Sequence, residues 1–248
     1  MSISEFKKVA RTKLNGNYFL CICSSLLYFI TLFALSYVES RIINIINNNT
    51  VTLLISFVFA LISLILGYGI IANILELSDI KTNSITNFLN ISIKNTTKII
   101  KLKLSIILKL IIPTIIFMFS SVYTYFSYFD NLIPMFMFSL IICIISLIFI
   151  IYIYLKYALT SYIYYSNSSL TSREIMKKSA EIMKGNKIKF ILLILSFFNW
   201  LLIASIILYI LGKFIPRPYL TPFIIIFHSL IKPYIVNCIS IFYDENNN

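Results

Sequence analysis

The charged residues of this chain are confined to a few short stretches, and the segments between them are apolar over lengths that cross a lipid bilayer. A hydrocarbon core takes roughly 20 consecutive apolar residues at the helical rise of about 1.5 Å per residue. The 248-residue sequence offers about six such runs, and its mean hydropathy is +0.91. We therefore predict an all-α, multi-pass membrane protein.

We expect a single integral membrane domain over residues 1–248, because the connections are too short for a separate soluble domain of ordinary size. The predicted spans are residues 18–38, 51–75, 104–126, 133–155, 190–211 and 219–243. The first run follows a basic leader and could be mistaken for a signal peptide. Its apolar region is about twice the usual 7–15 residues, which favours a retained helix.

Basic residues gather on alternate connections. The leader before residue 18 has four basic residues against one acidic residue, the 76–103 connection has five against two, and the 156–189 connection has seven against two. The positive-inside rule therefore predicts that both termini and these two connections are cytoplasmic. Lys213 and Arg217, between the last two spans, are the one discordant pair.

The net charge of +12 would suggest a nucleic-acid partner in a soluble protein. Here the basic residues flank apolar spans, so the lipid bilayer and its anionic headgroups are the expected partner, and nucleic acid is not. Ile, Asn, Lys, Phe and Tyr are abundant, which is typical of an AT-rich bacterial genome. We therefore expect the protein in a bacterial plasma membrane.

A short amphipathic segment precedes each pair of spans, which predicts three repeats of an interfacial helix followed by a transmembrane hairpin. The expected interfacial helices are residues 2–14, 84–98 and 172–184. The first and third begin with capping-box patterns and end in Gly16-Asn17 and Gly185-Asn186, where glycine suits a helix stop. The middle copy lacks this ending. Such helices either surround the cytoplasmic side of the protein and sense or bind another molecule there, or they only anchor the loops to anionic lipid.

His228 is the only histidine and lies within the sixth predicted span, where an ionisable group is a functional candidate. The alternative is a neutral imidazole that hydrogen-bonds to a neighbouring helix. The sequence has no His-x-x-x-His, Glu-x-x-His or Cys-x-x-Cys spacing and no Walker-type glycine loop. We therefore expect no cofactor, no metal site and no enzymatic activity.

Lysines near the third span suggest a site for lipid headgroups. Lys109 lies inside that span and can snorkel to the cytoplasmic headgroups. With Lys94, Lys98 and Lys101 it extends a basic track that is either a headgroup-binding groove or a plain anchor. The further candidate headgroup ligands, all on the third amphipathic segment, are Lys177, Lys178 and Lys184.

The second span carries small residues at offsets of four, three and four, which allow neighbouring helices to approach closely. These residues are Ser56, Ala60, Ser63 and Gly67. Gly69 follows two residues later, and Asn73 is placed to hydrogen-bond across a helix interface. We predict a packing role for this face, with an intramolecular contact and an oligomer contact both open.

Several short segments of the sequence, taken together, match the sequence pattern of one protein family. They are Ala10-Arg11, Leu14-Asn15-Gly16-Asn17, Leu155-Lys156-Tyr157-Ala158-Leu159-Thr160, Tyr162-Ile163, Leu170-Thr171-Ser172, Ser179, Met183-Lys184-Gly185-Asn186-Lys187, Ser196-Phe197-Phe198-Asn199-Trp200, Pro233-Tyr234 and Phe242-Tyr243. With these segments the chain resembles an uncharacterised family of multi-pass bacterial membrane proteins, common in Gram-positive bacteria and catalogued as a domain of unknown function. The resemblance implies a membrane topology and no established activity.

The leading functional hypothesis is a non-catalytic scaffold or accessory factor whose basic helices bind lipid or a partner membrane protein. The alternative is a permease-like subunit for peptide export or self-protection, with its ATPase on a separate chain. Six spans and about 250 residues suit that class by analogy. An intramembrane enzyme is the third class, and it needs His228, tyrosine or lysine groups to converge.

Overall fold

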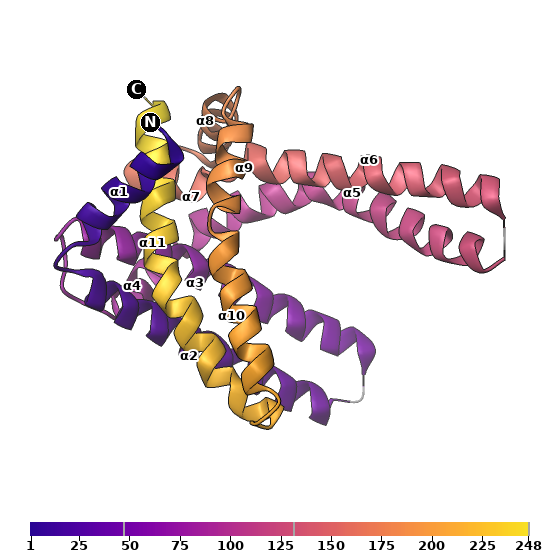
Figure 1. Cartoon of the computed structure of the whole chain (residues 1–248), viewed down its shortest axis with the longest axis horizontal. Coiled ribbons are helices and arrows are strands. Elements are labelled where there is room, and N and C mark those ends of the chain that lie inside the picture. Colours follow the sequence, from indigo (N-terminus) through magenta and orange to yellow (C-terminus); the bar gives the residue numbers. More distant parts are fainter. Residues whose placement is uncertain (47, 131, 248) are drawn as a thin grey trace. The chain divides into compact units, whose positions relative to one another are not determined.

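A computed structural model describes residues 1–46, 48–130 and 132–247, and these residues form helices and no strand (Figure 1). Within them, six stretches are long and apolar enough to cross a membrane: Tyr18–Ile45, Asn49–Ser78, Thr96–Phe129, Ile133–Ser166, Lys187–Leu211 and Thr221–Asn247. The prediction of an all-α, multi-pass membrane protein is confirmed. Each predicted span lies within one of these stretches, except that the sixth stretch begins at residue 221 rather than 219.

The chain divides into two compact units, which are described separately. Unit 1 comprises Met1–Ile100 and Ile188–Asn248, and unit 2 comprises Lys101–Lys187. The helices of unit 1 are α1 (Ile3–Leu14), α2 (Tyr18–Ile45), α3 (Asn49–Ser78), α4 (Asn87–Lys94), α9 (Lys187–Leu195), α10 (Phe198–Leu211), the 3-10 turn η1 (Arg217–Leu220) and α11 (Thr221–Asn247). Unit 2 contains most of α5 (Thr96–Phe129), followed by α6 (Ile133–Lys156), α7 (Thr160–Ser166) and α8 (Ser172–Ile182).

In unit 1 the first amphipathic helix packs its apolar face on protein. Phe6, Ala10 and Leu14 of α1 are buried, and the Phe6 ring lies 5.7 Å from that of Phe242 on α11. Burying this face removes apolar area from solvent, so the contact with α11 stabilises the helix. The position of α1 at the membrane surface stays a prediction, but its apolar face is already covered.

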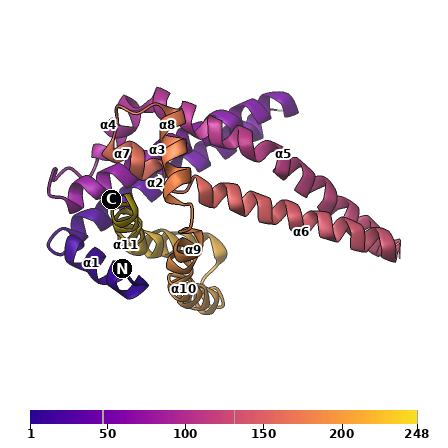
Figure 2. The same cartoon turned by 90° about the horizontal axis from the view of Figure 1, so that it is seen from above.

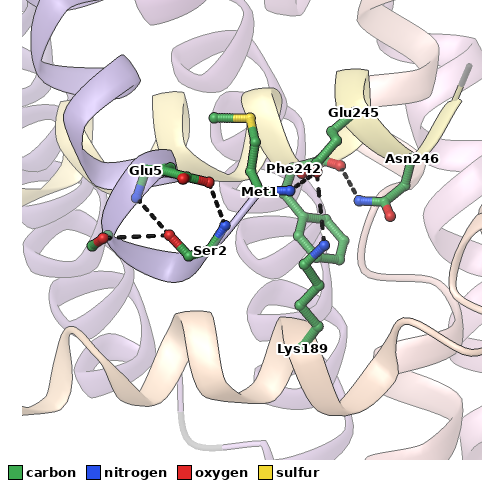
Figure 3. Close-up of polar contacts among 8 residues, drawn as sticks. Met1, Ser2, Glu5, Lys189, Phe242, Glu245 and Asn246 are labelled. Atoms are coloured by element: carbon green, nitrogen blue, oxygen red, sulfur yellow. Dashed lines mark hydrogen bonds and ion pairs between the residues drawn. The ribbon is translucent and has the colours of Figure 1, made fainter.

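The ends of α1, α9 and α11 meet at a polar cluster, which Figure 3 shows. The amino group of Met1 contacts the Glu245 carboxylate, and the Lys189 ammonium lies 3.8 Å from the same carboxylate. The Ser2 hydroxyl accepts a hydrogen bond from the Glu5 backbone N–H, and the Glu5 carboxylate accepts one from the Ser2 N–H. This capping box is the one that the sequence pattern predicts.

The glycines after the first and third amphipathic helices have the left-handed backbone that a helix stop requires. Gly16 has φ of +91° and Gly185 has φ of +88°. Because a side chain disfavours this conformation, glycine is the residue that ends these helices most easily. The middle segment has no such glycine. Its helix covers only residues 87–94, and α5 begins at Thr96 after the single residue Asn95.

The middle amphipathic helix, α4, packs on α3 at Gly69. The Ser92 hydroxyl contacts the Ile65 carbonyl of α3 at 3.2 Å and the Phe88 carbonyl of its own helix at 2.7 Å. A Cβ atom at Gly69 would clash with the Phe88 carbonyl and the Ser92 side chain. The absence of a side chain at Gly69 is therefore what lets the two helices touch.

In unit 2 the chain makes a long hairpin of α5 and α6, which run side by side in Figure 1 and Figure 2. Near its tip the Thr124 hydroxyl donates to the Ser139 hydroxyl at 2.9 Å, and the rings of Tyr128 and Phe136 are 5.8 Å apart. The outer surface of the hairpin is apolar: Phe119 is 74% exposed and Phe138 is 66% exposed. Such a surface needs lipid around it, because a soluble protein rarely exposes an apolar patch of this extent.

We expect Gly69→Ala to lower the free energy of unfolding by about 1–3 kcal/mol, the usual effect of inserting a group into a packed contact. Gly67→Ala is the matched control, because a Cβ there would meet only the Tyr28 hydroxyl at 3.7 Å, an ordinary contact. Thermal unfolding of the purified protein in detergent micelles measures the difference. Equal unfolding temperatures for the two variants would contradict a tight α3–α4 contact at Gly69.

Candidate functional site

A strongly basic groove lies in unit 2. It has a volume of about 630 Å³ and lies between α5, the end of α6 and α8. Its polar lining residues are Ser105, Lys109, Lys156, Tyr157, Arg173 and Lys177, and its remaining lining residues are apolar. The lining thus holds four cationic side chains and no carboxylate.

The groove is held open by the way α8 docks on the end of α6. The Ser179 hydroxyl is buried and donates to the Lys156 carbonyl at 3.0 Å. The carbonyls at a helix C-terminus lack partners within the helix, so this hydrogen bond satisfies one of them. Ile175 and Ile182 of α8 are buried as well. The apolar face of α8 is therefore covered by protein, while Lys177 on its other face is exposed.

Tyr157 organises two of the four cations. The residue is 8% exposed, and its hydroxyl accepts a hydrogen bond from the Lys109 ammonium at 3.0 Å. The Lys109 and Lys156 ammonium nitrogens lie 5.0 Å and 5.7 Å from the ring centroid. A phenol ring attracts cations through its electron-rich face and holds them near one another. The tyrosine O–H itself is left to donate to a ligand.

The start of α8 carries the carboxylate that lies nearest in sequence to Arg173. The Glu174 carboxylate accepts hydrogen bonds from the backbone N–H and the hydroxyl of Thr171. Both hydrogen bonds lower the pKa of the Glu174 carboxyl below its usual value, and the backbone hydrogen bond has the larger effect. Because the pKa of the Glu174 carboxyl is lower in the folded protein than in the unfolded chain, the cap adds to stability when the pH is above the ordinary pKa. This added stability is lost as the pH falls through the lowered pKa. The cap therefore remains intact at neutral pH.

The lining is suited to binding an anion. Lysine and arginine donate charge-assisted hydrogen bonds to phosphate or carboxylate oxygens, and arginine does so with two parallel N–H groups. The groove can therefore hold an anion.

One protein family covers this chain almost completely. The family described as "Protein of unknown function (DUF975)" matches residues 1–246. The chain belongs to the DUF975 family. This membership confirms the resemblance to an uncharacterised family of membrane proteins, and it assigns no activity. A search of curated proteins and a search of solved structures found no match to the DUF975 chain.

The structure distributes the predicted headgroup lysines of the DUF975 chain unevenly. Lys109 and Lys177 line the groove. Lys94 and Lys98 belong to unit 1, so the basic track predicted from the sequence divides between the two units. The predicted lysines of unit 2 that do not line the groove are Lys101, Lys178 and Lys184. The role of all of these residues in headgroup binding stays a prediction.

Among the described residues, the contacts of His228 are with a backbone carbonyl and with phenylalanine rings. It is exposed on α11, one of its ring nitrogens lies 2.8 Å from the Ile224 carbonyl, and its ring lies 5.8 Å from that of Phe29. One turn later on α11, the Lys232 ammonium lies over the Tyr28 ring at 4.0 Å and the Phe29 ring at 5.0 Å. Sequence analysis missed Lys232, although a lysine inside an apolar span is itself a signal.

Asn73 makes the interhelical contact that its position suggests. Its side-chain amide donates to the Ser24 hydroxyl of α2 at 2.8 Å and to the Ile85 carbonyl at 3.1 Å. The small residues before it lie on a partly exposed face of α3, where Ser56, Ser63 and Gly67 are half-buried and Ala60 is exposed. The tight contact of α3 with α4 falls at Gly69, and the packing role of the small-residue face stays a prediction. Asn73 thus acts as a structural link between α2 and α3.

Lys156, Tyr157 and Arg173 are the groove residues that sequence analysis did not single out as ligands. All three lie in or beside the segments that carry the family resemblance, which was the one available signal. Neither periodicity nor charge counting places the end of α6 beside α8. That proximity depends on the turn after Lys156 and on the short helix α7, whose residues Thr160–Tyr164 are buried.

We expect Ser179→Ala to lower the free energy of unfolding by about 1 kcal/mol, because a buried hydrogen bond between α8 and α6 is lost. Ser121→Ala is the control, since that hydroxyl is in an exposed setting and bonds only the Met118 carbonyl of its own helix. The measurement is thermal unfolding in detergent micelles. A Ser179→Ala protein as stable as the control would show that the hydrogen bond does not hold α8 in place.

Proposed function

We propose that the protein is a non-catalytic membrane accessory or scaffold protein whose basic groove binds the headgroup of an anionic phospholipid. The observation that carries the proposal is the convergence of Lys109, Lys156, Arg173 and Lys177 on one concavity without a carboxylate. Anionic phospholipids supply phosphate groups at the membrane surface, where basic residues at span ends attract them.

The surroundings of the groove favour a lipid over a soluble anion. Leu108, next to Lys109 on α5, is 65% exposed and lines the groove together with Met176 and Ala180. An acyl chain can lie on these apolar side chains while the phosphate meets the cations. A free inorganic anion would use only the polar half of the site.

The arrangement of α8 also supports the proposal. Because its apolar face is buried in unit 2, α8 does not need to insert that face into the bilayer. Its exposed basic side chains then serve headgroups or a partner rather than hold the helix on the membrane. In the topology that the charge pattern predicts, this face meets the cytoplasmic leaflet.

We expect the triple variant Lys109→Gln, Arg173→Gln, Lys177→Gln to lose at least about tenfold in its preference for phosphatidylglycerol over phosphatidylcholine, because it removes cations that attract a net negative headgroup and disfavour the choline cation of a zwitterionic one. Native mass spectrometry of the full-length protein, released from detergent micelles with a defined ratio of the two lipids, counts the lipids that remain bound.

The matched control is Lys101→Gln, Lys178→Gln, Lys184→Gln, which removes the same charge from unit 2 outside the groove lining. It should keep the preference of the unmodified protein, and circular dichroism confirms that both variants are helical. An equal loss in the control would mean that the basic surface as a whole attracts lipid and that the groove is not a site.

A further inference from the structure

A second pocket lies in unit 1, where the end of α1 meets α10 and α11. It has a volume of about 340 Å³, and its polar and aromatic lining comes from Arg11, Asn15, Tyr18, Trp200 and Tyr234. All of these except Tyr18 belong to segments that carry the family resemblance, and these segments lie far apart in the sequence. The fold thus gathers residues of four such segments around one cavity, and this cavity shares no lining residue with the basic groove of unit 2.

The walls of this pocket are fixed by tertiary contacts. The positive φ of Gly16 turns the chain from α1 into α2, which places Arg11 and Tyr18 on the same cavity. The Tyr18 hydroxyl donates to the Leu230 carbonyl at 2.7 Å, and the Tyr234 hydroxyl donates to the Lys7 carbonyl at 3.3 Å. The Phe197 ring meets the Tyr234 ring edge-on at 5.6 Å. The Tyr18 and Tyr234 side chains are therefore anchored before any ligand enters.

The chemistry of the pocket combines one cation with apolar and aromatic walls. The Arg11 guanidinium lies 5.8 Å from the centroid of the Tyr234 ring, and the pocket lining contains no carboxylate. Among the described residues, the Asn15 side chain makes no hydrogen bond, so its amide can donate to a ligand. A guanidinium binds phosphate with two parallel N–H groups, whereas Leu14 and Trp200 suit an apolar group.

The position of the pocket along the spans favours a membrane lipid. Tyr18 is the first residue of the first candidate span, so the pocket lies where that span begins, and Trp200 of the fifth span lines the same pocket. Tryptophan and tyrosine concentrate where headgroups meet the hydrocarbon core. We propose that this pocket binds the phosphate headgroup of one anionic phospholipid, with Arg11 and Asn15 as the phosphate ligands and Trp200 beside the start of an acyl chain.

Trp200 makes the proposal directly measurable, because it is the only tryptophan in the chain. The full-length protein in detergent micelles is titrated with phosphatidylglycerol whose acyl chains carry bromine, a short-range quencher of tryptophan fluorescence, and in parallel with brominated phosphatidylcholine. We expect quenching by phosphatidylglycerol at a concentration at least about tenfold lower. Equal quenching by the two lipids would overturn the proposal.

Arg11→Gln is expected to abolish this preference, since it removes the guanidinium and keeps a polar side chain of similar length. Lys8→Gln is the matched control: Lys8 lies exposed on the same helix and does not line the pocket. It should retain the preference, as should the groove triple variant of unit 2. If Arg11→Gln folds normally by circular dichroism and keeps the preference, or if Lys8→Gln loses it equally, the assignment to this pocket is wrong.

A third arm separates a lipid from a soluble phosphate ester. Glycerol 1-phosphate carries the same phosphate chemistry without acyl chains, and we expect millimolar amounts to leave the quenching by brominated phosphatidylglycerol unchanged. Displacement of the lipid by this compound at such concentrations would show that the pocket recognises a soluble ester, which contradicts the proposal.

Discussion

Lipid cannot satisfy the hydrogen-bonding groups of a backbone, and this constraint shapes the rest of the molecule. The long apolar segments must be helices, and their outer surfaces are apolar, as on α5 and α6. Several polar side chains within the spans turn inward: Ser24, Ser139 and Ser229 are buried. Ser229 donates to the Ile225 carbonyl one turn earlier in its own helix, so its hydroxyl is satisfied without a water molecule.

The two amphipathic helices with capping boxes are used in the same way in both units. Each buries its apolar face on protein, α1 against α11 in unit 1 and α8 beside the end of α6 in unit 2. Each contributes to a concavity in which a cation lies over a tyrosine ring, Arg11 over Tyr234 and Lys109 over Tyr157. Arg11 of α1 and Arg173 and Lys177 of α8 are the cations that these two helices contribute to the concavities.

Local sequence signals predicted the local features of this fold and left the long-range ones undetermined. Apolar runs located six spans, and the glycines at positions 16 and 185 located two helix ends, because both signals depend on neighbouring residues alone. The sequence did not place Tyr157 beside Lys109 or Trp200 beside Arg11, since those pairs depend on how distant helices pack. Segments resembling the family contained most of these residues, but the resemblance does not say which of them meet.

The most direct test of the central claim, that lipid surrounds these helices and the basic side chains face the cytoplasmic leaflet, is a topology measurement with paired reporters. Green fluorescent protein, which fluoresces only in the cytoplasm, and alkaline phosphatase, which is active only outside it, are each fused after Lys184 and after Phe129. The account predicts fluorescence without phosphatase activity at Lys184 and the reverse at Phe129. Phosphatase activity at Lys184 would contradict it.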